Sequence, residues 1–228
     1  MPTDEREYFA DAIRLFITKA ACEEYNERHV YMQKPVAVVK AEHNSGAAAR
    51  NAVPDDFYGL RPEIKLAVGA RVMYKTSTWT EDGLVNGQIG TVKAIVYAND
   101  TAPPNHLPKA VIVEFPNYIG PGYKGVPHHV ALTPNTVEAT INGKKCSRTQ
   151  LAIVLAFGMT IHKSQGLTVG PGCPLGKLVI NIGNKEHQSG LTFVALSRAK
   201  NISCLAMYPF PNFDRLEGLA TACEENAR

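Results

Sequence analysis

Strand-like and helix-like segments alternate at both ends of this chain, and a block of short strand-like runs separates the two ends. The apolar run Ile13 to Ile17 is followed by Thr18, a suitable helix N-cap, and by a charged, helix-favouring segment from Lys19 to His29. The same strand-then-helix texture returns from Gln150 onward. An interrupted pattern of this kind predicts an α/β domain with a second module inserted between its two parts.

The central block contains several short runs of β-branched and apolar residues. They are Ala70 to Tyr74, Ile89 to Tyr97, Ala110 to Phe115 and Val137 to Ile141. Turn signals separate them, and short strands this close in sequence favour a small antiparallel β-barrel. We therefore expect an inserted barrel over residues 66–145, with residues 1–65 and 146–228 as the two parts of the α/β domain.

The composition narrows the class of protein. With 228 residues, 45% hydrophobic and 20% charged, the chain can bury one core and a small module. The net charge of +3 permits nucleic-acid binding without indicating it. The five cysteines are scattered and form no CxxC pair, so we expect no metal site and an intracellular location, nuclear or cytoplasmic. No apolar run reaches the roughly 20 residues of a membrane span, so we expect no membrane partner and no secretion.

The most informative segment is the run TIHKSQG, which begins at Thr160 directly after an apolar stretch. If it is helical, Thr160 and Lys163 share one face. His162 and Gln165 then share a neighbouring face, about 100° around the axis. Thr, His and Lys can donate hydrogen bonds to phosphate oxygens without reading sequence, whereas Gln165 and Gly166 suit the close approach of a second polar partner. Taken without context, the same letters also fit a polar helix N-terminus on the surface.

This run is similar, letter for letter, to motif V of RecD-like superfamily-one helicases of the Pif type. Further segments resemble the same family in the same order along the chain. They are a strand–helix unit from Arg14, a barrel entry at Leu66 to Met73 and Gly83 to Gly87, a lead-in from Arg148 to Leu151, and a motif VI at Val194 to Ala199. The sequence departs from the family at Ala152, where proline is usual, and at Leu191, where many members have glutamine.

The resemblance implies a fold and a set of site residues. The fold would be a RecA-like second motor domain, of the P-loop NTPase type, with an inserted small antiparallel β-barrel. The implied DNA-binding residues are Thr160, His162, Lys163 and Ser164. The implied nucleotide-binding residues are Gln165, Gly166 and Arg198. In this scheme Arg198 is also catalytic, as an arginine finger for the γ-phosphate of ATP.

Motif VI carries its own structural expectation. We expect Phe193, Val194 and Leu196 to anchor a helix in the core, which would hold the Arg198 guanidinium as a rigid fork suited to phosphate. The alternative is a surface arginine that caps the C-terminus of that helix.

The chain has no G-x-x-x-x-G-K-[ST] phosphate loop, because the closest match, Gly170 to Lys177, has Pro171 and Leu178 at required positions. By the resemblance, ATP and Mg²⁺ are bound mainly by an N-terminal helicase domain absent from this chain. We therefore expect the chain alone to bind single-stranded DNA weakly and not to hydrolyse ATP. The family resemblance also associates it with DNA repair, recombination and telomere maintenance.

Two other functions fit the same letters. The chain could be a stand-alone or decayed nucleic-acid-binding module without enzymatic activity, in which only DNA contact survives. Alternatively, the inserted barrel could be a protein-docking module.

Overall fold

A computed structural model describes residues 3–44, 46–98, 101–183 and 190–210. The chain divides into two compact units. Unit 1 combines the two ends of the chain, Met1–Asn26 and Phe157–Arg228, and unit 2 is the continuous stretch Glu27–Ala156. The expected insertion of one module into another is therefore present.

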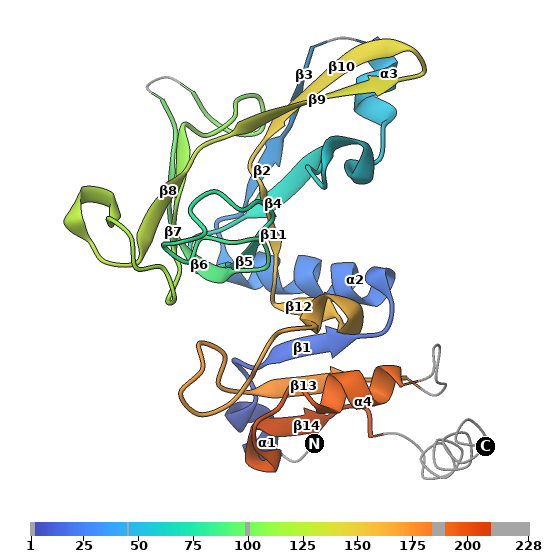
Figure 1. The fold of residues 1–228 in the computed structure, drawn as a ribbon, viewed down its shortest axis with the longest axis vertical. Helices are drawn as coiled ribbons and strands as arrows, with labels where there is room; N and C mark the ends of the chain where they lie inside the picture. The colour runs from blue at the N-terminus through green and yellow to red at the C-terminus, as the bar shows by residue number, and fades with distance from the viewer. Residues whose placement is uncertain (1–2, 45, 99–100, 184–189, 211–228) are drawn as a thin grey trace. The chain divides into compact units, whose positions relative to one another are not determined.

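Unit 1 is built around a four-stranded parallel sheet in the order β12-β1-β13-β14. Figure 1 shows the strands one beside another in this order. Their bounds are β1 Ile13–Phe16, β12 Gly158–Thr160, β13 Leu178–Asn181 and β14 Leu205–Met207. Ile13, Leu15, Leu178 and Ile180 have no exposed surface, as is typical of a parallel sheet covered on both faces.

Short helices accompany this sheet. They are α1 Thr3–Tyr8, α2 Lys19–Val30, η4 Ile161–Ser164, α4 Leu191–Leu196 and η5 Ile202–Cys204. The expected helix after the first strand is confirmed, and its start follows from a cap. The backbone N–H of Ala21 donates to Thr18 Oγ1 at 3.3 Å, which satisfies one of the donors that a helix start leaves unpaired.

Unit 2 contains three antiparallel sheets among its described residues. A five-stranded sheet has the order β11-β5-β6-β7-β8, a three-stranded sheet the order β3-β10-β9, and β2 pairs with β4. The strands are β2 Ala37–Lys40, β3 Glu42–His43, β4 Glu63–Leu66, β5 Arg71–Tyr74, β6 Ile89–Val96, β7 Ala110–Glu114, β8 His129–Leu132, β9 Asn135–Ile141, β10 Lys144–Gln150 and β11 Ile153–Leu155. The four predicted strand runs are therefore all present.

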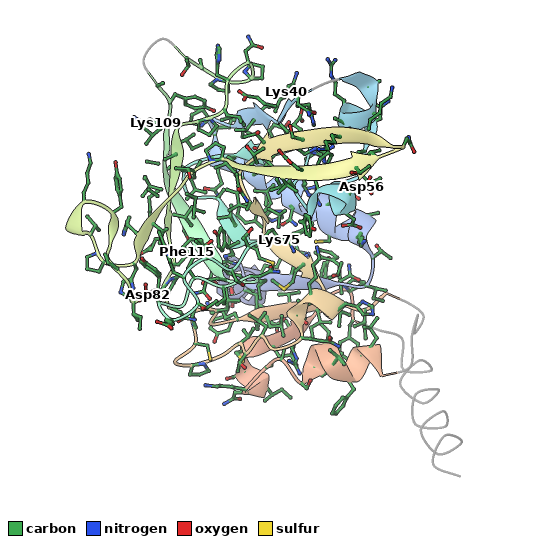
Figure 2. The ribbon with its side chains drawn as sticks, turned by 45° about the horizontal axis from the view of Figure 1, so that its top comes forward. Lys40, Asp56, Lys75, Asp82, Lys109 and Phe115 are labelled. Atoms are coloured by element: carbon green, nitrogen blue, oxygen red, sulfur yellow. The ribbon has the colours of Figure 1, made fainter. Side chains whose placement is uncertain are left out.

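The closed barrel is not confirmed. The strand order of the five-stranded sheet ends at β11 and β8, and no pairing in the described part of the chain joins these two edges. Figure 2 labels Phe115, which has no exposed surface, at the end of β7, and the exposed Lys40 and Lys109 on other parts of unit 2. The insert is thus a module built mainly of β-strands, with an open strand order.

Unit 2 is also larger than the predicted insert of residues 66–145. Pairing explains part of the difference, because β10 and β11 run past residue 145 and bond to β9 and β5 inside the predicted insert, and β3 bonds in turn to β10. As functional domains, the limits 1–65, 66–145 and 146–228 stay a prediction. Unit 2 also holds the helical turns η1 Tyr31–Gln33, α3 Gly46–Asn51, η2 Pro54–Phe57 and η3 Tyr123–Gly125.

The arginine of the Arg148-Thr-Gln-Leu run is completely buried in unit 2. Its guanidinium donates to three backbone carbonyls, those of Leu60 (2.8 Å), Ala49 (3.0 Å) and Ala52 (2.8 Å). It also lies over the Phe57 ring, 4.4 Å from its centroid. Burial lowers the pKa of Arg148, and the three carbonyls accept from its two terminal nitrogens, while the buried Nε has no hydrogen-bond partner. Arg148 therefore fastens α3 and the turn around η2 to β10.

Gln150, two residues further along, is equally buried. Its amide nitrogen donates to Val39 O at 3.2 Å, and its amide oxygen accepts from Leu151 N at 2.9 Å. The lead-in to the TIHKSQG run is thus a structural element, in which both polar side chains satisfy backbone groups of unit 2.

Candidate nucleic-acid and nucleotide site

The TIHKSQG run lies at the carboxyl ends of the parallel strands of unit 1. Thr160 is the last residue of β12 and pairs in register with Phe16, the last residue of β1. Phe16 in turn pairs with Asn181, the last residue of β13. Open parallel sheets bind ligands outside the carboxyl ends of their strands. The position of the segment therefore favours ligand contact over a purely structural role.

The local geometry of this run differs from the expected helix. Only Ile161–Ser164 are helical, in a single 3₁₀ turn, while Thr160 and Gln165 have extended backbone angles. Thr160 and Gln165 lie outside this turn, so the predicted sharing of helix faces between Thr160 and Lys163, and between His162 and Gln165, does not apply. A 3₁₀ turn has three residues per turn, so residues three apart eclipse each other.

This periodicity separates buried from exposed side chains. Ile161 and Ser164, three apart, have no exposed surface, and Thr160 is 7% exposed. His162 and Lys163, between them, are exposed. The Ser164 hydroxyl donates to Ile161 O at 2.7 Å and so closes the turn from inside. The donor side chains of His162 and Lys163 thus face outward, and the DNA-binding role assigned to Ser164 stays a prediction.

Gly166 ends the turn and reverses the chain. Its φ of +83° lies in the left-handed region, which favours glycine, and nothing lies within 4 Å of the position of a Cβ. The turn is completed by Leu167 N, which donates to Ser164 O at 2.9 Å. Gln165 and Gly166 are both exposed, so the space above this turn is open to a second ligand.

Arg198 lies against the residue that follows this turn. Its guanidinium donates to Leu167 O at 3.4 Å, to Val194 O at 3.0 Å and to Ser197 Oγ at 2.8 Å. Val194 belongs to α4, so Arg198 does cap its own helix, as the alternative interpretation expected. It also bridges from that helix to the turn at Gly166. The arginine is half-buried and directed by three acceptors of its own chain.

Backbone contacts join the two motifs further. Val169 N donates to Arg198 O at 2.9 Å, and Lys200 N donates to Val169 O at 2.9 Å, which makes a short parallel bridge. Helix α4 also packs against η4. The structure therefore brings together the two segments that the sequence singled out, 31 residues apart between Leu167 and Arg198.

The anchors predicted for α4 are incorrect. Phe193 is 74% exposed, and Val194 and Leu196 are only half-buried, whereas Leu191 and Ala195 are buried. Residues four apart share one face of a helix, so Leu191 and Ala195 form the inner stripe and Phe193 falls on the outer side. The spacing of Leu191 and Ala195 could have indicated the buried face of the helix. The large apolar side chain of Phe193 instead suggested that Phe193 was the core anchor.

One polar contact of this region was not anticipated from the sequence. Asn26, on α2, donates from Nδ2 to Gly158 O at 2.9 Å and accepts from Gly158 N at 2.8 Å. Cys22 Sγ also donates to Gly158 O, at 3.2 Å. Asn26 is 7% exposed, and Gly158 starts the strand that leads into Thr160. The two partners are 132 residues apart in sequence, and no local pattern connects them.

Within the described part of the chain, neither a metal-binding group of side chains nor a membrane-spanning helix is present. No three His, Cys, Asp or Glu side chains in it are grouped so that they could hold a metal ion. No helix within it is both long enough and apolar enough to cross a membrane.

The chain is similar to known Pif1 helicases both in sequence and in fold. The human ATP-dependent DNA helicase PIF1 is 33% identical over 147 residues, which cover 64% of this chain and 19% of the relative. The Pif1 helicase of Candida albicans aligns over 99% of this chain and 55% of its own, with a TM-score of 0.65 and 23% identity. A Bacteroides Pif1 helicase in complex with ADP-AlF3 and ssDNA aligns over 94% of this chain and 46% of its own, with a TM-score of 0.58 and 21% identity. No family model matches the chain.

The parallel sheet and its carboxyl-edge segment form an α/β fold similar to that of solved Pif1 helicases. More narrowly, the chain is homologous to Pif1 DNA helicases, which confirms the resemblance seen in the motifs. The chain spans about a fifth of the human relative's length and about half of the aligned structures. This partial coverage fits the C-terminal half of such a helicase.

Proposed function

We propose that this chain is the second motor domain of an ATP-dependent DNA helicase and that the Thr160–Gly166 segment grips single-stranded DNA. One observation carries the proposal. The exposed His162 and Lys163 lie at the carboxyl edge of the parallel sheet, in a turn that Arg198 contacts through Leu167. This arrangement offers one surface to a phosphate backbone and a second, adjoining group to a nucleotide.

The DNA contact is electrostatic and independent of base sequence. Lys163 supplies a positive charge with three donors, and the His162 ring can donate to a phosphate oxygen. Thr160 is 7% exposed, so it would contribute less to the DNA contact than the exposed His162 and Lys163. A site with so few cations neutralises few phosphates, so its affinity is weak and its salt dependence shallow.

The nucleotide contact belongs to Arg198, with Gln165 and Gly166 beside it. A guanidinium is a planar, permanently charged fork that matches phosphate geometry. In the chain alone this fork is directed at Val194 O, Leu167 O and Ser197 Oγ. Contact with a γ-phosphate therefore requires Arg198 to exchange at least one of these acceptors for a phosphate oxygen.

ATP and Mg²⁺ are held mainly by a first motor domain in this proposal. The 228 residues contain no phosphate loop, and the described ones contain no acidic cluster suited to Mg²⁺. This chain would contribute charge stabilisation of the transferring phosphoryl group. Unit 2 would correspond to the small barrel inserted in the second motor domain.

The test is single-stranded DNA binding by the 228-residue chain, measured as fluorescence anisotropy of a labelled oligonucleotide over a salt series. Lys163→Ala is compared with Lys177→Ala, which removes the same charge from unit 1. Lys177 pairs with Asp11 and lies just before β13, at the opposite edge of the sheet.

We expect Lys163→Ala to weaken binding and to make the slope of log K against log salt shallower by about 0.7. We expect Lys177→Ala to leave both unchanged. Equal effects of the two substitutions would show that only net charge matters and would refute the assigned site.

A further inference from the structure

We infer that Asn26 is a positioning residue, which fixes the start of β12 and thereby orients His162 and Lys163 for DNA. The inference rests on the proposed function for its DNA readout, but the contact itself does not depend on that function. Asn26 touches neither ligand. It acts through Gly158, two residues before Thr160.

The contact fixes both the position and the rotation of one peptide segment. The side-chain amide of Asn26 has one donor and one acceptor directed at the same residue, and Gly158 N–H and C=O occupy both, at 2.8 and 2.9 Å. A single hydrogen bond would permit the strand to pivot about it. Two hydrogen bonds from one planar amide prevent the strand from pivoting.

The contact lies on the outer edge of the sheet. β12 is an outer strand of its sheet, paired with β1 alone. Phe157 O accepts from Arg14 N in that pairing, while the N–H and C=O of Gly158 are bound by Asn26. Asn26 thus takes the place of a neighbouring strand at the edge of β12, where unpaired backbone groups would otherwise be buried.

The glycine is required for this approach. A Cβ on residue 158 would lie 2.7 Å from a ring carbon of Phe16 and 3.1 Å from one of Tyr25. A contact of 2.7 Å is shorter than real Cβ contacts and one of 3.1 Å is tighter than most, so a larger residue would push β12 away from β1 and α2. Gly158 therefore lets β12 pack closely because it has no Cβ, and Asn26 then forms hydrogen bonds with its backbone.

The strand that Asn26 fixes is short and leads directly into the site. β12 has three residues, after which the chain enters the 3₁₀ turn with His162 and Lys163. A shift of Gly158 therefore also moves His162 and Lys163, which lie only four and five residues further along the chain. Site residues act only when they are held by such supporting contacts.

The experiment uses three substitutions in the 228-residue chain. Asn26→Leu removes both hydrogen bonds, and Asn26→Asp retains the acceptor for Gly158 N–H but removes the donor at near-constant shape. Thr18→Ala is the matched control, because it removes the N-cap of the same helix without touching Gly158. The readouts are the dissociation constant for labelled oligo-dT, the melting temperature, and hydrogen–deuterium exchange of residues 158–166.

We expect Asn26→Leu to raise the dissociation constant about tenfold or more, since Gly158 N–H loses its acceptor and Gly158 O keeps only the weak Cys22 thiol donor. Asn26→Asp should give an intermediate loss. Thr18→Ala should lower the melting temperature while changing the dissociation constant less than about twofold. Exchange over residues 158–166 should quicken in both Asn26 variants and not in the control.

Two outcomes would overturn the inference. The first is equal loss of DNA affinity in Asn26→Leu and Thr18→Ala at matched melting temperature, which would make Asn26 an ordinary stabilising residue. The second is unchanged exchange over residues 158–166 in Asn26→Leu, or in Asn26→Asp should the leucine variant not fold. If the unsubstituted chain itself fails to bind DNA, the proposed function fails, and the exchange measurement still decides the role of Asn26.

Discussion

Arg148 and Arg198 both belong to segments that resemble the same helicase family, yet the two arginines differ in every physical respect. Arg148 is completely buried, and three carbonyls and an aromatic ring surround its guanidinium. Arg198 is half-buried and shares its donors among one helix carbonyl, one turn carbonyl and a hydroxyl. The difference teaches that a family motif can mark architecture as readily as chemistry, and that burial distinguishes the two.

The largest effect should come from Arg198 in the presence of a first motor domain, supplied by a related helicase. Arg198→Ala should lower DNA-stimulated ATP turnover by ~10³-fold, because an arginine finger acts mainly in the transition state. DNA affinity should be almost unchanged, since His162 and Lys163 are retained. Steady-state ATPase and DNA anisotropy on the same preparation measure both. Near-normal turnover in this variant would remove the distinction between the two arginines.

Arg148→Ala should instead act on folding. It leaves three buried carbonyls without their donor and opens a cavity, so the free energy of unfolding should fall by about 3 kcal/mol or more. Urea unfolding followed by circular dichroism gives the value. Arg148→Lys is the control that keeps the charge but cannot reach three acceptors with one fork, and it should lose an intermediate amount. A loss under about 1 kcal/mol for Arg148→Ala would mean that the buried contacts contribute little.

A smaller effect is expected at the proposed DNA contact. His162→Ala removes one phosphate donor from an exposed turn, so the dissociation constant for single-stranded DNA should rise about three- to tenfold. The melting temperature should not change, because His162 is exposed. With the first motor domain present, ATP affinity measured without DNA should also be unchanged. Loss of that affinity would assign the turn to the nucleotide rather than to DNA.

The smallest effect should come from Phe193. Its side chain is 74% exposed on α4, so Phe193→Ser should change the free energy of unfolding by less than about 0.5 kcal/mol. Leu191→Ala, on the buried stripe of the same helix, should lower it by about 2 kcal/mol or more. Thermal unfolding of the two variants separates them. A large loss in Phe193→Ser would restore the original expectation of a core anchor.

The sequence predicted those parts of the fold that local signals determine. Thr18 and the charged residues after it predicted the start of α2, and runs of β-branched residues predicted β5, β6, β7 and β9. The letters of the TIHKSQG run located the candidate site before its surroundings were known. These features depend on neighbours within a few residues.

The features that were missed are one local turn and two arrangements that depend on distant partners. The 3₁₀ turn at Ile161–Ser164 arises because the Ser164 hydroxyl bonds back to the chain and Gly166 reverses it, which stops a longer helix. Closure of a barrel depends on which strands meet at the sheet edges, and the individual strand sequences do not determine that. The pairing of Asn26 with Gly158 joins residues 132 positions apart.

The insertion of unit 2 has a consequence for the order of folding. Phe16 and Thr160 are neighbours in the parallel sheet, yet the whole of Glu27–Ala156 is synthesised between them. Contacts across so long a stretch of chain form late, because the closure entropy precedes any gain from pairing. Unit 2 is continuous and can assemble on the ribosome, whereas the sheet that carries the candidate site cannot start until β12 has emerged. We therefore expect the sheet that carries the candidate site to form after unit 2.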